Sequence, residues 1–93
     1  MGLLVGKSVV ITGAGRGIGA ATARALVREG MKVAIGDLDA ALAATTAAEI
    51  GAGTIGLPLD VTNRQSFEEF VDEAERQLGP IDVLVNNAGI MPL

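Results

Sequence analysis

The sequence predicts an α/β fold in which short, buried strands alternate with helices. Four apolar runs are bounded by Gly, Pro, Asp or Asn, a pattern typical of strands that are covered on both faces. Three segments with helical spacing separate these runs, and each is followed by a glycine that can close a helix. This alternation predicts parallel pairing through right-handed crossovers, with the element order β-α-β-α-β-α-β in a single domain that spans residues 1–93.

The expected strands are short, and the first two are dominated by Val and Ile. They cover residues 8–12 (SVVIT), 32–36 (KVAIG), 54–59 (TIGLPL) and 81–86 (IDVLVN). Pro58 lies within the third strand and has no amide hydrogen to donate to a neighbouring strand. We therefore expect the third strand at an edge of the sheet.

The expected helices are amphipathic or rich in alanine. The first covers residues 17–29, and the second covers residues 39–50 with Asp39 as its N-cap. A Thr62–Gln65 capping box precedes the third, which should end before Gly79. Apolar side chains at helical spacing should face the core. These are Ile18, Ala21, Ala25 and Leu26 in the first helix, and Phe67, Phe70, Val71, Ala74 and Leu78 in the third.

The composition limits the kinds of partner and chemistry. The chain carries a formal net charge of −4, and its basic residues are scattered from Lys7 to Arg76, which argues against binding to nucleic acid or to anionic membranes. It has no cysteine and no histidine, so we expect no disulfide, no thiolate chemistry and no transition-metal site. No apolar stretch reaches the roughly 18 residues of a membrane span, and the amino terminus is unlike a signal peptide. We expect a cytoplasmic protein.

A glycine-rich turn, Thr12-Gly-Ala-Gly-Arg-Gly-Ile-Gly19, lies where the first strand should meet the first helix. In that context glycines allow a sharp bend and let the backbone approach a pyrophosphate, while the helix start attracts negative charge. Two registers fit: G-x-G-x-x-G/A at Gly15, Gly17 and Ala20, and G-x-x-x-G-x-G at Gly13, Gly17 and Gly19. We favour the second, because the strand should end at Thr12 and the bend should begin directly after it.

An acidic residue, Asp37, follows the second expected strand, 18 positions after Gly19. A carboxylate there can accept hydrogen bonds from the adenosine ribose hydroxyls and would repel the 2′-phosphate of NADP, so the expected cofactor is NAD. Arg16 in the turn argues weakly for NADP, because a guanidinium can pair with that phosphate. The alternative is that Asp37 only caps the following helix, although Asp39 is already placed for that role.

Two further motifs complete a family resemblance. Asp60-Val61 follows the third expected strand, and Asn86-Asn87-Ala88-Gly89 closes the fourth. With Thr12, Gly13, Gly17 and Gly19 as T-G-x-x-x-G-x-G, the chain from about Gly6 to Gly89 resembles the amino-terminal, cofactor-binding portion of short-chain dehydrogenases/reductases. The resemblance implies a Rossmann-like, doubly wound parallel sheet, here partial and truncated, with strand order 3-2-1-4. It also implies adenine contact at the Asp-Val pair and, at the last motif, stabilisation of the sheet beside the ribose and nicotinamide.

The turn and these motifs together give the expected cofactor contacts, which should meet at the carboxyl ends of the strands. The set is Gly13, Arg16, Gly17, Ile18, Gly19, Asp37, Leu38, Asp60, Val61, Asn87, Ala88 and Gly89. Asp60 has an alternative role as a turn-forming residue before Thr62, and the two asparagines have one in a local Asx-turn. Either role is compatible with contact to the cofactor.

No catalytic residue is expected among these 93 residues. In the family that the chain resembles, a Ser, a Tyr-x-x-x-Lys pair and an Asn further along the sequence carry the reaction. The chain has no Tyr, and its serines are Ser8, in a strand, and Ser66, in a helix. We therefore expect the cofactor-binding portion of an NAD-dependent alcohol/carbonyl oxidoreductase, inactive by itself. The alternatives are a non-catalytic dinucleotide-binding module or redox sensor, and an inactive truncated fragment.

The topology has a consequence for packing. Crossovers of one hand place the first two helices on one face of the sheet and leave the third alone on the other. Part of that face and the free edge of residues 81–86 should then face water. We expect the chain to self-associate through this apolar surface or through the edge.

Overall fold

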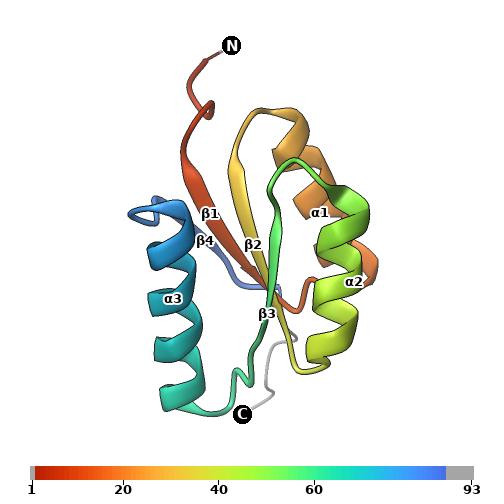
Figure 1. Ribbon diagram of the computed structural model, residues 1–93, viewed down its shortest axis with the longest axis vertical. Helices are drawn as coiled ribbons and strands as arrows, with labels where there is room; N and C mark the ends of the chain where they lie inside the picture. The colour runs from red at the N-terminus through yellow and green to blue at the C-terminus, as the bar shows by residue number, and fades with distance from the viewer. Residues whose placement is uncertain (1, 88–93) are drawn as a thin grey trace.

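The computed structural model describes residues 2–87, which form a four-stranded parallel sheet covered by helices (Figure 1). The elements are β1 Ser8–Thr12, α1 Gly17–Arg28, β2 Lys32–Asp37, α2 Ala40–Ile50, β3 Ile55–Pro58, α3 Arg64–Leu78 and β4 Val83–Val85. The strands lie in the order β3-β2-β1-β4, which confirms the predicted order and the Rossmann-like topology. Helices α1 and α2 cover one face, and α3 covers the other, as crossovers of one hand require.

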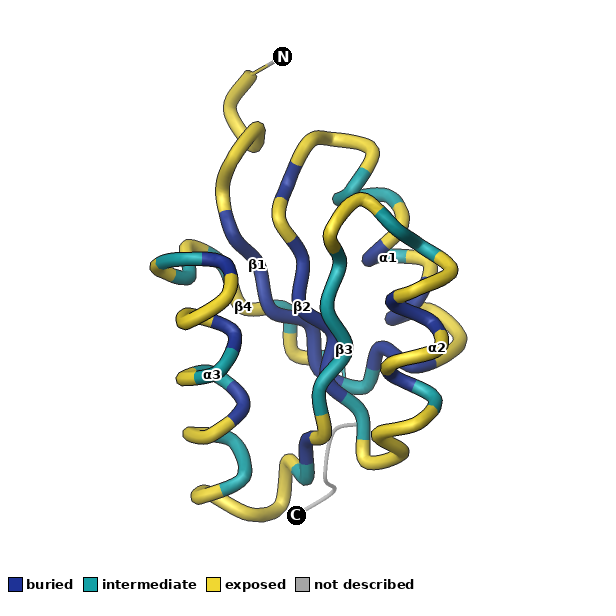
Figure 2. Tube along the Cα trace, in the orientation of Figure 1, coloured by how far each residue is buried: buried dark blue, intermediate teal, exposed yellow. Residues whose placement is uncertain are grey.

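The core has two layers because successive strand residues point to opposite faces of the sheet. Val9 and Ile11 of β1 pack beneath α1 and α2, whereas Val10 packs against α3. Figure 2 shows β1 and most of β2 buried at the centre, between the two helical layers. On the α3 side, the predicted stripe is confirmed: it consists of buried Phe70, Ala74 and Leu78 with Phe67 and Val71 packed beside them.

The third strand lies at a sheet edge, as Pro58 predicts. Pro58 pairs with Asp37 at the end of β2, and β3 has no partner on its other side within the described sheet. The strand is shorter than the predicted 54–59, yet pairing continues beyond it through the Leu59 amide, which donates to the Asp37 carbonyl at 2.9 Å. This contact brings the segment after β3 next to the end of β2.

The face of α1 that meets the sheet differs from the predicted one. Ile18 is 78% exposed and Ala21 is also exposed, so their expected burial is wrong. The close contact of Gly19 with the backbone at Gly13 sets the rotation of the helix instead. The residues that α1 buries are Gly19, Ala20 and Ala23.

Helix α3 begins with a different cap from the predicted Thr62–Gln65 capping box. The N-cap is Asn63, whose side-chain oxygen accepts a hydrogen bond from the Ser66 amide at 2.9 Å. The Thr62 side chain is directed to the preceding turn instead, where its hydroxyl donates to the Asp60 carboxylate at 2.6 Å. Asparagine is at least as good an N-cap as threonine, so the helix starts one position later.

β4 forms the second edge of the described sheet and is shorter than the predicted 81–86. Leu84 pairs with Val10, so its side chain lies on the α3 face, where it is 50% exposed. The connection before β4 is tied to β1, because the buried Ser8 hydroxyl donates to the Leu78 carbonyl at 3.0 Å. Within residues 2–87, every helix is too short or too polar to cross a lipid bilayer.

Candidate cofactor-binding site

The turn between β1 and α1 leaves the start of a helix without a side-chain cap. α1 begins at Gly17, and its N-cap residue Arg16 makes no capping hydrogen bond with its side chain. The equivalent positions of α2 and α3 hold Asp39 and Asn63, whose side chains do accept amide hydrogens. The first-turn amides of α1, reinforced by the helix dipole, therefore form a site that suits an anion.

Two glycines of this turn have left-handed backbone conformations. Gly13 has a φ of +62° and Gly17 a φ of +63°, values that residues with a Cβ adopt only with strain. Among residues 2–87, no heavy atom beyond its chain neighbours and its own helix would lie within 4 Å of a Cβ on Gly17, so the described part of the turn is open on that side. A side chain at Gly17 would occupy the space beside the helix start.

Two other glycines permit close packing. A Cβ on Gly19 would lie 2.6 Å from the Gly13 carbonyl oxygen and 2.7 Å from Nδ2 of Asn87. A Cβ on Gly15 would lie 2.7 Å from Oδ2 of Asp37. The turn therefore requires glycine at both positions. Gly15 was absent from the register that we favoured and present only in the alternative one.

The Asp37 carboxylate is held against the turn by two backbone amides. Its Oδ2 accepts from the Gly15 amide at 3.0 Å, and its Oδ1 accepts from the Asp39 amide at 2.9 Å. Asp39 is the N-cap of α2, as predicted, and accepts from the Leu42 amide at 3.0 Å. A carboxylate has about four lone-pair positions, so Asp37 keeps acceptor capacity for hydroxyl groups of a ligand.

Asp60, after β3, has the turn-forming contacts considered from the sequence. Its Oδ1 accepts from the Thr62 hydroxyl at 2.6 Å and from the Thr62 amide at 3.0 Å. These two bonds, the hydroxyl one first, hold the pKa of Asp60 below its usual range, because they stabilise the ionised carboxylate. The Asp60 amide donates to Oγ of Ser66 at 2.9 Å, which joins this turn to α3.

A hollow of about 230 Å³ opens at the carboxyl ends of β1, β2 and β3. Two exposed apolar side chains, Leu38 and Val61, line it next to the carboxylates of Asp37 and Asp60. The complete lining is Gly13, Asp37, Leu38, Leu59, Asp60, Val61 and Thr62. The structure therefore brings five predicted site residues together around one hollow, whereas exposed Arg16 and Ile18 lie outside it.

Thr12 joins the carboxyl ends of β1 and β4. Its Oγ1 donates to Oδ1 of Asn86 at 2.9 Å and accepts from the Asn87 amide at 2.9 Å. These bonds connect two strands, and Asn87 lies beside Gly19. Ala88 and Gly89, the remaining predicted contacts, lie outside the described residues.

Comparison with known proteins agrees with this geometry. Residues 7–93 match the family described as short chain dehydrogenase. The chain belongs to this family. Sorbitol dehydrogenase of Cereibacter sphaeroides is 49% identical over 90 residues, which cover 97% of this chain and 35% of that protein. Galactitol 2-dehydrogenase of Agrobacterium fabrum is 45% identical over 87 residues, which cover 94% of this chain and 34% of that protein.

A solved structure of the same fold contains a nicotinamide cofactor. It is the crystal structure of 3-ketoacyl-(acyl-carrier-protein) reductase from Brucella melitensis complexed with NADH, similar with a TM-score of 0.89 and 40% sequence identity. The match covers 94% of this chain and 36% of the reductase. This short-chain dehydrogenase chain thus spans about a third of the length of the relatives that it matches.

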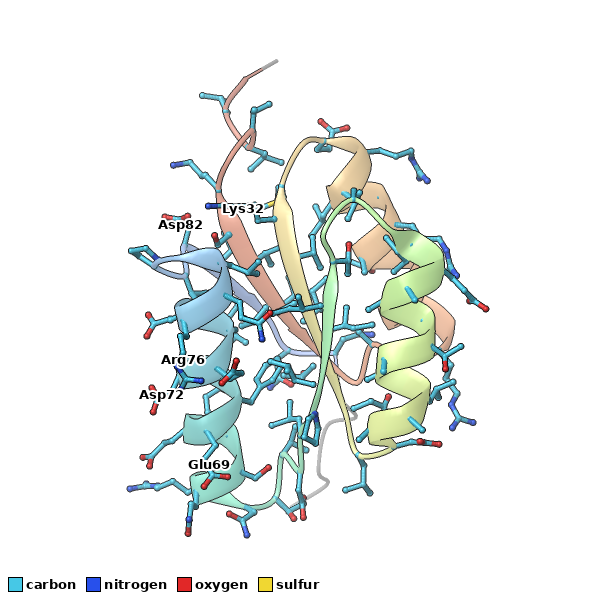
Figure 3. The ribbon with its side chains drawn as sticks, viewed as in Figure 1. Lys32, Glu69, Asp72, Arg76 and Asp82 are labelled. Carbon is cyan, nitrogen blue, oxygen red and sulfur yellow. The ribbon has the colours of Figure 1, made fainter. Side chains whose placement is uncertain are left out.

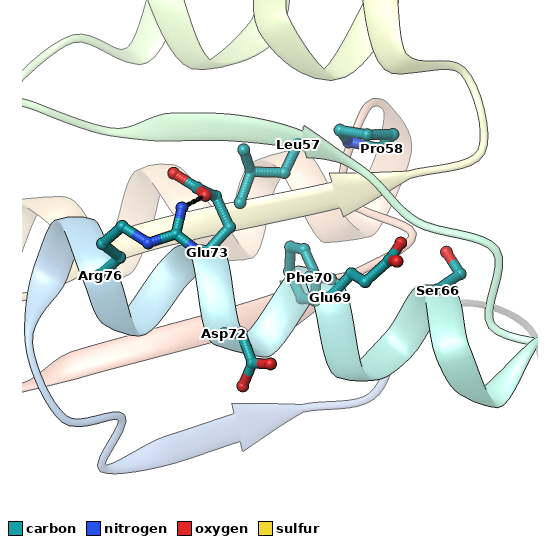
Figure 4. A pocket seen from close by; sticks show the side chains of 8 residues that line it. All are labelled: Leu57, Pro58, Ser66, Glu69, Phe70, Asp72, Glu73 and Arg76. Atoms are coloured by element: carbon teal, nitrogen blue, oxygen red, sulfur yellow. Dashed lines mark hydrogen bonds and ion pairs between the residues drawn. The ribbon is translucent and has the colours of Figure 1, made fainter.

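A second and larger hollow, of about 440 Å³, lies between β3 and α3 (Figure 4). Glu69, Asp72 and Glu73 stand around it, and Arg76 pairs with Glu73. Figure 3 shows Glu69, Asp72 and Arg76 along α3. Only the smaller of these two hollows is lined by a residue of the glycine turn, Gly13, which precedes the uncapped start of α1, so the smaller hollow is the better candidate for the cofactor site. Within residues 2–87 no group of three or more acidic, histidine or cysteine side chains could hold a metal ion.

Sequence reasoning missed Thr46, a residue of α2 that bonds to the glycine turn. The Thr46 hydroxyl of α2 donates to the Gly15 carbonyl at 2.6 Å and is buried. The available signal was a threonine on the face of an alanine-rich helix that also buries Ala43 and Ala47. Helical spacing does not tell such a threonine from one that bonds within its own helix.

Proposed function

We propose that this chain is the cofactor-binding portion of an NAD-dependent oxidoreductase, whose complete form transfers hydride between nicotinamide and an alcohol or carbonyl substrate. The observation that carries the proposal is the start of α1, which has no side-chain cap, lies behind a glycine turn, and has the Asp37 carboxylate held against that turn. Membership of the short-chain dehydrogenase family and likeness to a reductase solved with NADH support it.

The residues present fit a dinucleotide. The amides of Gly17, Ile18 and Gly19 at the start of α1 would hold the pyrophosphate, and Asp37 would accept from the adenosine ribose hydroxyls. Leu38 and Val61 line the hollow with exposed apolar surface, which suits the flat adenine ring. The family resemblance assigns Asp60 to the adenine end, and Asn87, Ala88 and Gly89 to the ribose and nicotinamide end. When bound, the nicotinamide supplies or accepts hydride.

The preference for NAD over NADP is part of this proposal. Two backbone amides fix the Asp37 carboxylate in place, so the carboxylate cannot swing away from a 2′-phosphate without losing both bonds. Arg16, the group that favours NADP, is exposed, and salt and water weaken its attraction. Repulsion by the fixed charge should therefore outweigh attraction by the exposed one.

We further propose that these 93 residues do not turn over substrate by themselves. They contain no Tyr and no His to act as the general acid or base. The Ser8 hydroxyl is buried and bonded to the Leu78 carbonyl, and the Ser66 hydroxyl accepts from the Asp60 amide. Neither serine lines the smaller hollow, which is the candidate cofactor site. A dinucleotide-binding module or sensor without catalysis has the same binding residues and is the alternative reading.

Calorimetric titration of the chain with NAD, NADP and ADP-ribose tests the binding proposal. NAD should bind at least about fivefold more tightly than NADP, since a charge repulsion of about 1 kcal/mol separates them. ADP-ribose should bind nearly as well as NAD, because the described contacts lie at the adenosine and pyrophosphate. Tighter binding of NADP would refute the NAD assignment, and a folded chain that binds none of the three would refute the function.

Two further expectations belong to the same proposal. Leu84 is exposed and β4 forms an edge of the sheet within residues 2–87, and both features favour self-association of this chain through that side of the sheet. We also predict a cytoplasmic location, because the sequence has no cysteine. Fractionation of cells that express a tagged chain would test this prediction.

A further inference from the structure

Thr46 is a buried polar residue whose hydroxyl bonds outside its own helix. The residue is 5% exposed, and its Oγ1 donates to the Gly15 carbonyl at 2.6 Å, across 31 positions of sequence. Thr22 of α1, by contrast, donates to the Ile18 carbonyl one turn earlier in the same helix, at 2.8 Å. The Thr46 bond therefore connects α2 directly to the glycine turn.

Gly15 is held from two directions by this bond and by Asp37. Its amide donates to Oδ2 of Asp37 at 3.0 Å, while its carbonyl accepts from Thr46. The peptide that joins Gly15 to Arg16 is trans and planar, so its C=O and N–H point in opposite directions. With the carbonyl turned toward α2, the Arg16 amide points away from α2. The bond from Thr46 of α2 thus sets the orientation of the turn.

We propose that Thr46 is a positioning residue that aims the amides of the turn at the dinucleotide, an inference that rests on the proposed function. Loss of the hydroxyl leaves the Gly15 carbonyl as a buried acceptor without its side-chain partner, and the peptide to Arg16 is then free to rotate. Affinity for the cofactor should fall although Thr46 itself does not touch the cofactor. The isosteric change to valine is not conservative here, because it removes the hydroxyl.

Three variants of the 93-residue chain test the proposal. Thr46→Val removes the hydroxyl and keeps the shape, Thr46→Ser keeps the hydroxyl, and Thr45→Val makes the same change at the adjacent, exposed threonine. Thr46→Val should weaken NAD binding about tenfold in calorimetry, the effect of one lost hydrogen bond to a buried group. Thr46→Ser should restore most of the affinity, and Thr45→Val should bind as the parent does. Parent-like binding by Thr46→Val, or equal losses in the valine and serine variants, would overturn the proposal.

Amide hydrogen exchange without ligand separates this inference from the proposed function. Exchange at the Gly15 amide should be about tenfold faster in Thr46→Val than in Thr45→Val, while β1 stays equally protected in both. If the parent chain does not bind NAD, the proposed function fails, and this exchange measurement still decides whether Thr46 holds the turn. Equal exchange at Gly15 in the two variants would overturn the positioning role even if NAD binds. If Thr46→Val does not fold, Thr46→Ser alone decides, and a tenfold loss of affinity in it contradicts the inference.

Discussion

Replacing Gly17 with alanine separates the cost of backbone strain from the cost of obstructing the turn. Gly17 has a φ of +63°, and Gly53 in the loop before β3 has a φ of +77°. A Cβ on either would have no heavy atom of another described segment within 4 Å. Alanine at either position therefore strains the backbone by roughly 1–2 kcal/mol without a steric clash. Gly53→Ala is the matched control, because Gly53 lies between α2 and β3 and not at the start of α1.

Both variants should lose similar stability, with the Tm falling by about 4–8 °C for each kcal/mol of strain in a domain of this size. Only Gly17→Ala should lose affinity for NAD, because its methyl group occupies the open side of the helix start. The loss should be about tenfold or more, the effect of one weakened hydrogen bond from an amide to a charged phosphate.

The assay is calorimetric titration with NAD at a temperature below the melting transition of both variants, with circular dichroism melts to compare stability. Gly53→Ala should bind NAD as the parent does. Equal loss of affinity in the two variants would mean that strain alone weakens binding. Parent-like affinity in Gly17→Ala, with its stability reduced, would refute the idea that the pyrophosphate lies against this turn.

Three other predictions concern specificity, titration and assembly. Asp37→Asn should shift the ratio of NAD to NADP affinity toward NADP by about fivefold, since it removes a repulsion of about 1 kcal/mol, and an unchanged ratio in titrations would contradict the role of the charge. Thr62→Val should raise the pKa of Asp60, because the hydrogen bond from the Thr62 hydroxyl lowers that pKa. Carbon NMR of the Asp60 carboxyl group measures the change. The ionised Asp60 stabilises the fold at neutral pH, and this contribution is lost as the pH falls through the lowered pKa. The free energy of unfolding of the variant should therefore fall less in acid than that of the parent. An unchanged pKa in the variant would exclude the Thr62 bond as the cause of the lowered pKa. Leu84→Lys should reduce the molar mass measured by light scattering, since the exposed half of this side chain contributes about 1 kcal/mol to association; an unchanged mass would exclude this edge as the interface.

The positions of the strands and helices were predictable because they follow from local patterns, whereas the strand order 3-2-1-4 came from the family resemblance. Strand residues such as Val9 and Val10 are apolar in succession, which indicates burial on both faces, and Pro58 indicates an edge. The handedness of parallel crossovers then leaves one arrangement for the three helices. Asp37 was predicted at the end of a strand for the same reason, since the apolar run stops there.

The contacts of the turn were not predictable, because they join residues that are distant in sequence. Asp37 bonds to Gly15 across 22 positions and Thr46 bonds to Gly15 across 31. Periodicity placed Ile18 toward the core, whereas the tight approach of Gly19 to Gly13 rotates it to the surface. No pattern in a single sequence reports which small residue will touch which backbone atom.

The glycines of this site differ in whether they serve the fold or the ligand. A side chain at Gly19 would clash with the Gly13 carbonyl and with Asn87, so its replacement disturbs the packing of α1 on the sheet together with the turn. A Cβ on Gly17 would contact no residue of the described chain, so its requirement for glycine comes from its φ and from the ligand that we propose for the open side. A turn that served only to connect β1 and α1 would need neither an open side at Gly17 nor a helix start without a side-chain cap. Under the proposed function, this open side is where the phosphate binds, and the Thr46 bond holds the turn next to it.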